Sequence, residues 1–274
     1  MLIGPRFAAA IAQQSRLNRD VAELNTQIST QKRLQQASDD PVAASRIAAI
    51  AKLQASETTW LANVESLSAL ALRVDAGLGE ANAMMDQATE LVTLARTGTA
   101  TPADRATAAS QLRDIAADLR AIMARTDSRG QPLFPQTPAL EIPVGKGRTL
   151  AATTTRDDAF GPAGASLADF AEAAAAALES GNSDAMGSSL SALQAAQDRL
   201  ADVRGEQGVR MTRIDGARDQ LIASATAMIE ERSGLEDTDI TEATPRLQAK
   251  MLTLEAAQAA FARINRRTLF DLLG

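Results

Sequence analysis

Each end of the chain carries a stripe of mainly apolar residues whose spacing alternates between three and four positions. Near the N-terminus the stripe consists of Phe7, Ala10, Gln14, Leu17, Val21, Leu24 and Ile28. Near the C-terminus it consists of Ile240, Thr244, Leu247, Met251, Leu254, Gln258 and Phe261. This spacing places each stripe on one face of a helix that packs as a coiled coil. Because a single helix cannot bury such a stripe, each end is expected to pack against the other end or against another copy of the chain.

The segment after the first stripe predicts a very long second helix. The first helix is expected over residues 5–34, and Asp40 followed by Pro41 suits the cap and first position of the next helix. That second helix is expected to continue to Gly98, with Glu57 as the one polar residue in its apolar stripe. Such a polar residue can set the register of a coiled coil.

Further capping residues mark the remaining helices. Thr101 begins a capping box at the start of a third helix, and Ser166 caps a short alanine-rich helix over residues 167–179. A long helix is expected over residues 184–231, and the last helix follows an acidic interruption. Pro245 lies inside that last helix, which either starts there with Thr244 as its cap or kinks.

Between these helices the sequence changes character. Prolines interrupt residues 131–165, and two short extended runs, residues 139–144 and 148–155, flank Gly145-Lys146-Gly147. This pattern predicts a small β-hairpin.

The sequence therefore predicts a mainly α fold, a long antiparallel helical hairpin or coiled-coil rod with a small β-hairpin region. Residues 1–40 with 236–274 are expected to form a terminal coiled-coil assembly domain. Residues 41–130 with 166–235 are expected to form a helical core domain, and residues 131–165 the β-hairpin region.

Composition disfavours an enzyme. The 274 residues include no Cys, no His and no Tyr, and only 3% are aromatic. A disulfide scaffold and thiolate chemistry are therefore excluded, and the commonest general base and metal ligand is missing. No catalytic residue, cofactor or metal site is assigned.

Charge is unevenly distributed along the chain. The net charge is −6, yet residues 1–38 and 245–274 each hold five basic residues against two acidic ones, so the middle is strongly acidic. Because the basic residues are not tightly clustered and lack interleaved aromatics, no nucleic-acid partner is expected.

The N-terminus superficially imitates a signal peptide. Its apolar run from Phe7 to Ala12 has six residues, whereas a cleavable signal needs about 7–15. No apolar run reaches the roughly 20 residues of a membrane span. If the protein leaves the cell, the expected route is one that does not cleave it.

Two acidic clusters are interpreted as helix caps. Asp39-Asp40 precedes a helix that begins with proline, and residues 236–242 precede the last helix, where acids are electrostatically favoured. The spacing in the second cluster matches no calcium-binding loop.

Several stretches resemble one known family. Leu24–Arg33 followed by Ala37–Ala44 is similar to the N-terminal signature of bacterial flagellins and flagellar hook-associated proteins. Arg204–Ile214, Gly234–Ala243 and Leu254–Phe261 are similar to further stretches of that family. Within the family, the chain resembles the hook–filament junction proteins (hook-associated protein 3) more than flagellin.

The resemblance implies a structural subunit that joins hook to filament and polymerises through its terminal helices. It implies type III export, an extracellular flagellar location, an export chaperone, and assembly with the hook-side junction protein and flagellin. The assembly interface is then expected at eight stripe residues, which are Leu17, Val21, Leu24, Ile28, Leu247, Met251, Leu254 and Phe261. A short flagellin and an intracellular coiled-coil signalling or adaptor protein are the alternatives.

Overall fold

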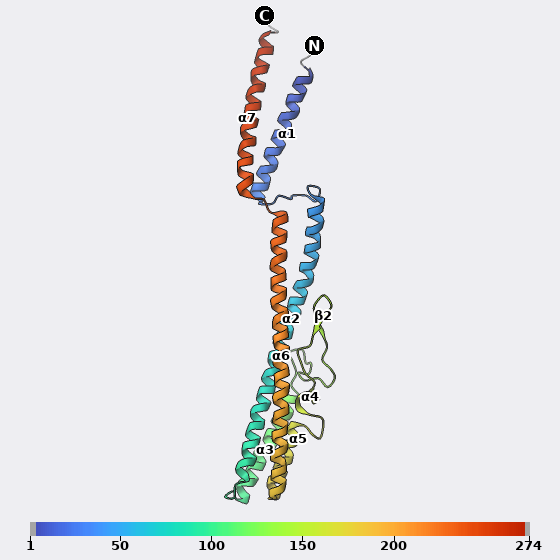
Figure 1. Ribbon diagram of the computed structural model, residues 1–274, viewed down its shortest axis with the longest axis vertical. Coiled ribbons are helices and arrows are strands. Elements are labelled where there is room, and N and C mark those ends of the chain that lie inside the picture. The colour runs from blue at the N-terminus through green and yellow to red at the C-terminus, as the bar shows by residue number, and fades with distance from the viewer. Residues whose placement is uncertain (1–3, 272–274) are drawn as a thin grey trace. The chain divides into compact units, whose positions relative to one another are not determined.

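The computed structural model describes the backbone of residues 4–271 and the side chains of residues 8–263 (Figure 1). The helices are α1 (Gly4–Thr30), α2 (Pro41–Ala95), α3 (Pro102–Met123), α4 (Arg156–Phe160), α5 (Leu167–Ser180), α6 (Ser183–Glu236) and α7 (Ile240–Asp271). Strands β1 (Ile142–Gly145) and β2 (Arg148–Leu150) form an antiparallel pair. The predicted mainly α class with a small β-hairpin is confirmed.

Two compact units divide the chain. One contains residues 1–55 and 225–274, and the other contains residues 56–224, so α2 and α6 each contribute to both. The three-domain division drawn from the sequence stays a prediction.

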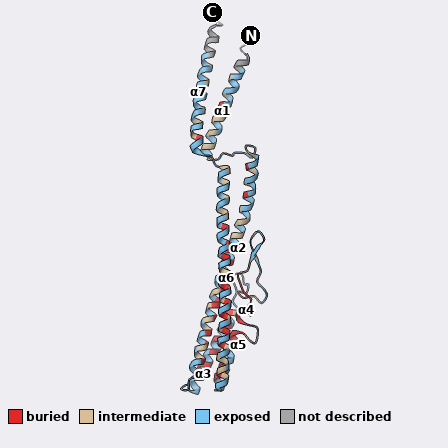
Figure 2. Ribbon diagram, in the orientation of Figure 1, coloured by how far each residue is buried: buried red, intermediate tan, exposed pale blue. Residues whose placement is uncertain are grey.

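The core of the 56–224 unit is built from closely packed helices. Figure 2 shows buried residues concentrated along α3, α5 and the accompanying parts of α2 and α6. Alanines at 168, 171, 174 and 175 of α5 are fully buried, and α5 packs against α3. Because alanine side chains are small, the two helix backbones approach closely without bulky aromatic side chains between them.

A few larger side chains fill the gap beside α2. The rings of Phe134 and Phe160 meet edge to face, with centroids 4.7 Å apart. A Cβ atom added at Gly77 would lie 3.2 Å from Phe134 Cζ, so the glycine allows this ring to pack against α2.

One buried glutamine ties the β-hairpin region to the helices. Gln207 has no exposed surface, and its Nε2 donates to the carbonyl oxygens of Ala71 (3.2 Å) and Ala152 (3.0 Å). Asn63 Nδ2 donates to the Pro143 carbonyl oxygen at 2.8 Å. Buried polar groups are tolerated only when they are hydrogen-bonded, so these contacts specify where the hairpin sits.

The predicted caps are confirmed. Thr101 and Ser166 each form a capping box with the aspartate three residues later, and Asp40 accepts a hydrogen bond from the Ala43 backbone N–H at 3.0 Å. Glu57 accepts a hydrogen bond from Ser224 Oγ at 2.6 Å, which satisfies one oxygen of the polar residue in the α2 stripe.

Several predicted helix ends were wrong. The first helix ends at Thr30, because Gln31 adopts the left-handed conformation (φ 58°) and its carbonyl oxygen pairs with Thr238. The penultimate helix continues through Gly234 to Glu236 instead of ending at residue 231. The short helix α4 was not predicted from the sequence.

The last helix begins at Ile240 and not at Pro245. Asp239 Oδ1 accepts from the backbone N–H of Thr241 (2.8 Å), and the Asp239 carbonyl oxygen accepts from Ala243 (2.8 Å). Asp239 therefore caps the helix in place of Thr244. Pro245 follows within the second turn, where its missing N–H leaves only the Thr241 carbonyl without its usual partner.

Gly161→Ala is expected to destabilise the 56–224 unit strongly. Gly161 has φ 91°, and an added Cβ atom would lie 2.4 Å from the Ala165 carbonyl oxygen. The strained backbone alone costs about 1–3 kcal/mol, and the clash adds to it. Denaturant unfolding followed by circular dichroism measures the loss.

Gly164→Ala in the same loop is the matched control. Gly164 also has a positive φ (84°), but nothing lies within 4 Å of its added Cβ atom. This variant should lose only about 1–2 kcal/mol. Equal losses for the two variants would contradict the role assigned to the clash.

Candidate functional site

The two terminal helices pack against each other in antiparallel fashion, and together they are called the terminal pair here. Helix α1 contacts α7, and Figure 1 shows the two running in opposite directions. Both helices belong to the unit formed by residues 1–55 and 225–274.

The contact face of α1 follows the predicted stripe. Leu17 is 8% exposed, and the other side chains of this face from residue 8 onward are half-buried. These half-buried residues include Ala10, Gln14, Val21, Leu24 and Ile28. The side chain of Phe7 lies outside the described residues.

The contact face of α7 differs from the predicted stripe at three positions, the first of which is Ile240, with 43% of its surface exposed. Leu247, Leu254 and Phe261 are half-buried as the stripe requires, but Met251 is 45% exposed and Gln258 is exposed. The neighbouring Lys250 and Ala257 are half-buried in their place. The assignment of Met251 and the other seven stripe residues to an assembly interface stays a prediction.

A groove of about 550 Å³ runs between the terminal helices. Its lining combines leucines with charged groups of both signs. The lining residues are Leu17, Asp20, Glu23, Leu24, Arg246, Ala249, Lys250 and Thr253. Lys250 Nζ lies 2.7 Å from Asp20 Oδ2, so an ion pair joins the two helices across the groove.

A polar clasp holds the base of the terminal pair, formed by residues 31–36 and 232–238. Its backbone part is a short antiparallel contact between Lys32 and Asp237. The Arg33 N–H donates to the Glu236 carbonyl oxygen at 2.7 Å, and the Thr238 N–H donates to the Gln31 carbonyl oxygen at 2.9 Å. The clasp therefore joins two segments that are about 200 residues apart in the sequence.

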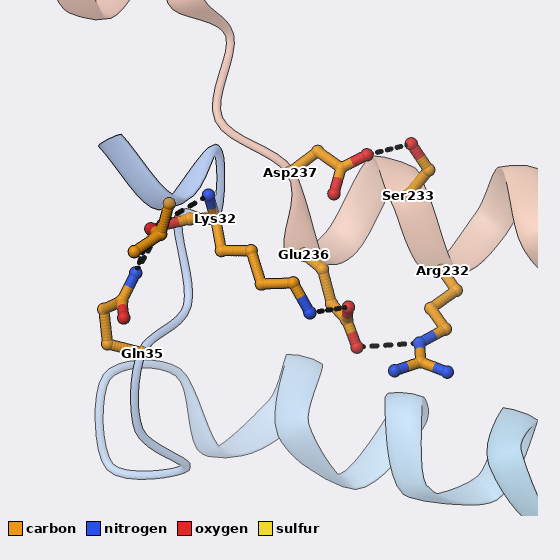
Figure 3. A network of polar contacts seen from close by, with 7 residues as sticks. Lys32, Gln35, Arg232, Ser233, Glu236 and Asp237 are labelled. Carbon is orange, nitrogen blue, oxygen red and sulfur yellow. Dashed lines mark hydrogen bonds and ion pairs between the residues drawn. The ribbon is translucent and has the colours of Figure 1, made fainter. Parts of the chain in front are cut away.

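Glu236 is the central side chain of the clasp (Figure 3). Its carboxylate accepts from Arg232 Nε at 2.8 Å and from Lys32 Nζ at 3.1 Å, and its side chain is 14% exposed. The hydrogen bond from Arg232, and then that from Lys32, lower the pKa of the Glu236 carboxyl below its ordinary value of 4.5. Arg33 Nη2 adds a hydrogen bond to the Leu235 carbonyl oxygen at 2.9 Å.

A second ion pair lies near the clasp in the same unit. The Arg46 guanidinium donates to both carboxylate oxygens of Glu231, at 2.5 and 3.0 Å, which links the start of α2 to the end of α6. This contact lowers the pKa of Glu231. Both side chains are substantially exposed, so the pair contributes orientation more than stability.

The sequence interpretation missed the polar residues of the site. Lys32 and Arg232 were assigned no pairing role, and Glu236 was interpreted with its acidic neighbours as favouring the start of the last helix. Asp239 does cap that helix, but Glu236 pairs with basic side chains. The sequence signal for the pairing of Glu236 was only the presence of basic residues in both segments of the clasp, and the spacing of these residues matches no known motif.

No metal or membrane feature accompanies the site. In the part of the chain that the structure describes, no three carboxylates gather closely enough to hold a metal ion. None of the described helices is both long and apolar enough to span a bilayer.

Comparison with known proteins connects this geometry to a family. Residues 190–273 match the family model described as the bacterial flagellin C-terminal helical region. This match covers most of α6 and the described part of α7. No curated protein matches the chain.

Solved structures share the fold. A protein described as a flagellar hook-associated protein from Vibrio parahaemolyticus matches with a TM-score of 0.66 and 16% identity, over 73% of this chain and 100% of that one. FlgL from Xanthomonas campestris matches with a TM-score of 0.52 and 15% identity, over 60% of this chain and 93% of that one.

Glu236→Gln is expected to destabilise the clasp by about 1–2 kcal/mol at neutral pH, since it removes the charge from two hydrogen bonds. Because the pKa of Glu236 is lowered in the folded chain, its contribution is full above pH 4.5 and is lost as the pH falls through the lowered value. Wild type and variant should therefore converge in acid. Melting temperatures measured between pH 3 and pH 7 give this dependence (roughly the range spanned by carboxyl titration).

Glu230→Gln serves as the control, because Glu230 is an exposed carboxylate on the same helix. It should leave the melting temperature nearly unchanged. A difference between wild type and Glu236→Gln that persisted undiminished at the acidic end would contradict the ion-pair explanation.

Proposed function

We propose that the chain is a structural subunit of the bacterial flagellum and a member of the flagellin and hook-associated superfamily. Two findings support this proposal: residues 190–273 match the flagellin C-terminal helical region, and the fold is similar to that of solved flagellar proteins. Polymerisation occurs through the terminal pair. The observation that carries the proposal is the antiparallel packing of α1 against α7, which brings both chain ends into one helical pair with an open groove.

The finer role within the flagellum is the junction between hook and filament. Two of the matching solved structures support this role, because one is described as a flagellar hook-associated protein and the other is FlgL. The similarity of the end segments to hook–filament junction proteins supports it as well.

A short flagellin is the second candidate. The family match itself is to the flagellin C-terminal region, and among the described residues the β-hairpin region lies outside the long helices, where it would form a reduced outer domain. A filament subunit would use the same terminal pair.

Partners follow from the proposed role. On the hook side the subunit contacts another junction protein, and on the filament side it contacts flagellin. Before assembly, an export chaperone covers the C-terminal stripe, in which Met251 is 45% exposed, together with the adjacent Leu252, which is 69% exposed. Export occurs without cleavage of the N-terminus, and the assembled protein is extracellular. The role requires neither catalysis nor a cofactor.

Immunogold electron microscopy of flagellated cells distinguishes the candidates. Antibody against this protein should label only the boundary between hook and filament. Label along the whole filament would instead establish a flagellin, and absence of surface label would favour the intracellular adaptor. A strain that lacks the gene controls for antibody specificity.

Leu254→Asp is expected to abolish assembly while residues 41–232 remain helical. Leu254 is half-buried on the contact face of α7, and an unpaired carboxylate there is costly. Sedimentation of polymerised protein measures assembly, and circular dichroism measures helicity.

Leu254→Met preserves side-chain volume and is the matched control, which should assemble normally. Incorporation of Leu254→Asp at the wild-type level would refute the role of the terminal pair in assembly.

A further inference from the structure

The apolar residues of the terminal pair leave its register ambiguous. Leu17 and Leu24 are seven residues apart on α1, as are Leu247, Leu254 and Phe261 on α7. Sliding one helix along the other by seven residues would again place large apolar side chains opposite one another. An apolar stripe with this repeat therefore specifies which faces meet, but it discriminates poorly between registers.

The ion pair between Asp20 and Lys250 removes this ambiguity. In the observed register the two groups are 2.7 Å apart. A slip of seven residues in either direction would place Asp20 level with Ala243 or Ala257. The same slips would place Lys250 level with Gln13 or Gln27. None of these level positions carries an opposite charge.

Neighbouring charges favour the same register. Glu23 and Arg246 line the groove together with the ion pair, so opposite charges gather in the observed arrangement. After a slip of seven residues, the place of Arg246 in the groove beside Glu23 would be taken by Thr253 in one direction or by Asp239 in the other. Like charges brought together are destabilising.

The clasp holds the same register at one end of the pair. Lys32 lies twelve residues after Asp20, and its partner Asp237 lies thirteen residues before Lys250. The ten helical residues from Asp20 to the end of α1 at Thr30 alone span about 15 Å, so the ion pair acts well beyond the reach of the clasp.

We propose that Asp20 and Lys250 are positioning residues that set the register of α1 against α7. Their side chains are 43% and 44% exposed, so the pair adds little to overall stability. The ion pair instead favours one register of α1 against α7, because it is formed in that register and lost in the others. The proposal concerns pairing within one chain and does not depend on the flagellar role.

The absence of cysteine from the chain provides a direct test. Leu24 and Arg246 lie four residues from Asp20 and Lys250 respectively, on level positions, and both line the groove. The full chain carrying Leu24→Cys and Arg246→Cys should form an intramolecular disulfide efficiently. Leu24→Cys with Thr253→Cys, and Leu17→Cys with Arg246→Cys, report the two slipped registers and should cross-link poorly.

Lys250→Glu, introduced into each of the three double-cysteine variants, places a second carboxylate opposite Asp20. The native disulfide should then fall severalfold in yield while one or both slipped disulfides rise. Exchanging the charges, with Asp20→Lys and Lys250→Glu together, should restore the wild-type pattern. Arg263→Glu reverses an exposed charge on the same helix and should change nothing.

An unchanged pattern in Lys250→Glu would overturn the proposal. If Lys250→Glu merely separates the helices, the double variant Asp20→Lys with Lys250→Glu provides the decisive test. Failure of this charge exchange to restore the native disulfide would also overturn the proposal. Both readouts are intramolecular, so they remain valid whether or not the protein assembles into flagella.

Discussion

The structure depends on burying long apolar stripes that no single helix can bury. Each helix satisfies its own backbone hydrogen bonds, but its apolar face requires a partner. The partners come from distant parts of the sequence, since α1 packs against α7 and the core of the 56–224 unit joins α2, α3, α5 and α6. Few aromatics are available, and the core instead relies on alanines that let helix backbones approach closely.

Polar contacts supply the specificity that these stripes lack. Gln207 is fully buried and bonded to Ala71 and Ala152, which fixes the β-hairpin region against the helices. In the clasp, the Glu236 carboxylate accepts hydrogen bonds from Arg232 and Lys32. If the elements shifted, the Gln207 amide would lose both carbonyl acceptors, and Glu236 would keep Arg232 but lose Lys32. The cost of losing these hydrogen bonds opposes the shift.

The combination of apolar stripes for attraction and polar contacts for specificity suits a subunit that assembles. Under the proposed function, apolar surface along the terminal helices would attract a neighbouring subunit, whereas the clasp and the ion pair would define how the two terminal helices present that surface. A sharply defined pair offers each neighbour the same contact face, which a repeating assembly requires. Nothing in this arrangement calls for the chemical groups that the composition lacks.

The sequence by itself determined which segments other than α4 are helical, where most of these helices begin, and most of the apolar face of α1. Those features depend on local signals: the stripe spacing, the capping residues Thr101, Ser166 and Asp40, and the glycines and prolines around the hairpin. The similarity of the end segments to flagellins and hook-associated proteins was likewise readable from short stretches. Only the tertiary structure decided the end of α1 at Thr30, because the pairing of Gln31 with Thr238 depends on a segment about 200 residues away.

The contact face of α7 was also decided by tertiary structure. Adjacent residues such as Lys250 and Met251 both fit a stripe of average spacing 3.5, and hydrophobicity favoured the methionine. Lys250 lies inward because its charge meets Asp20 while its aliphatic stem packs along the groove, and Met251 stays half-exposed. Periodicity describes one helix at a time, whereas the identity of the partner residue depends on how two helices meet.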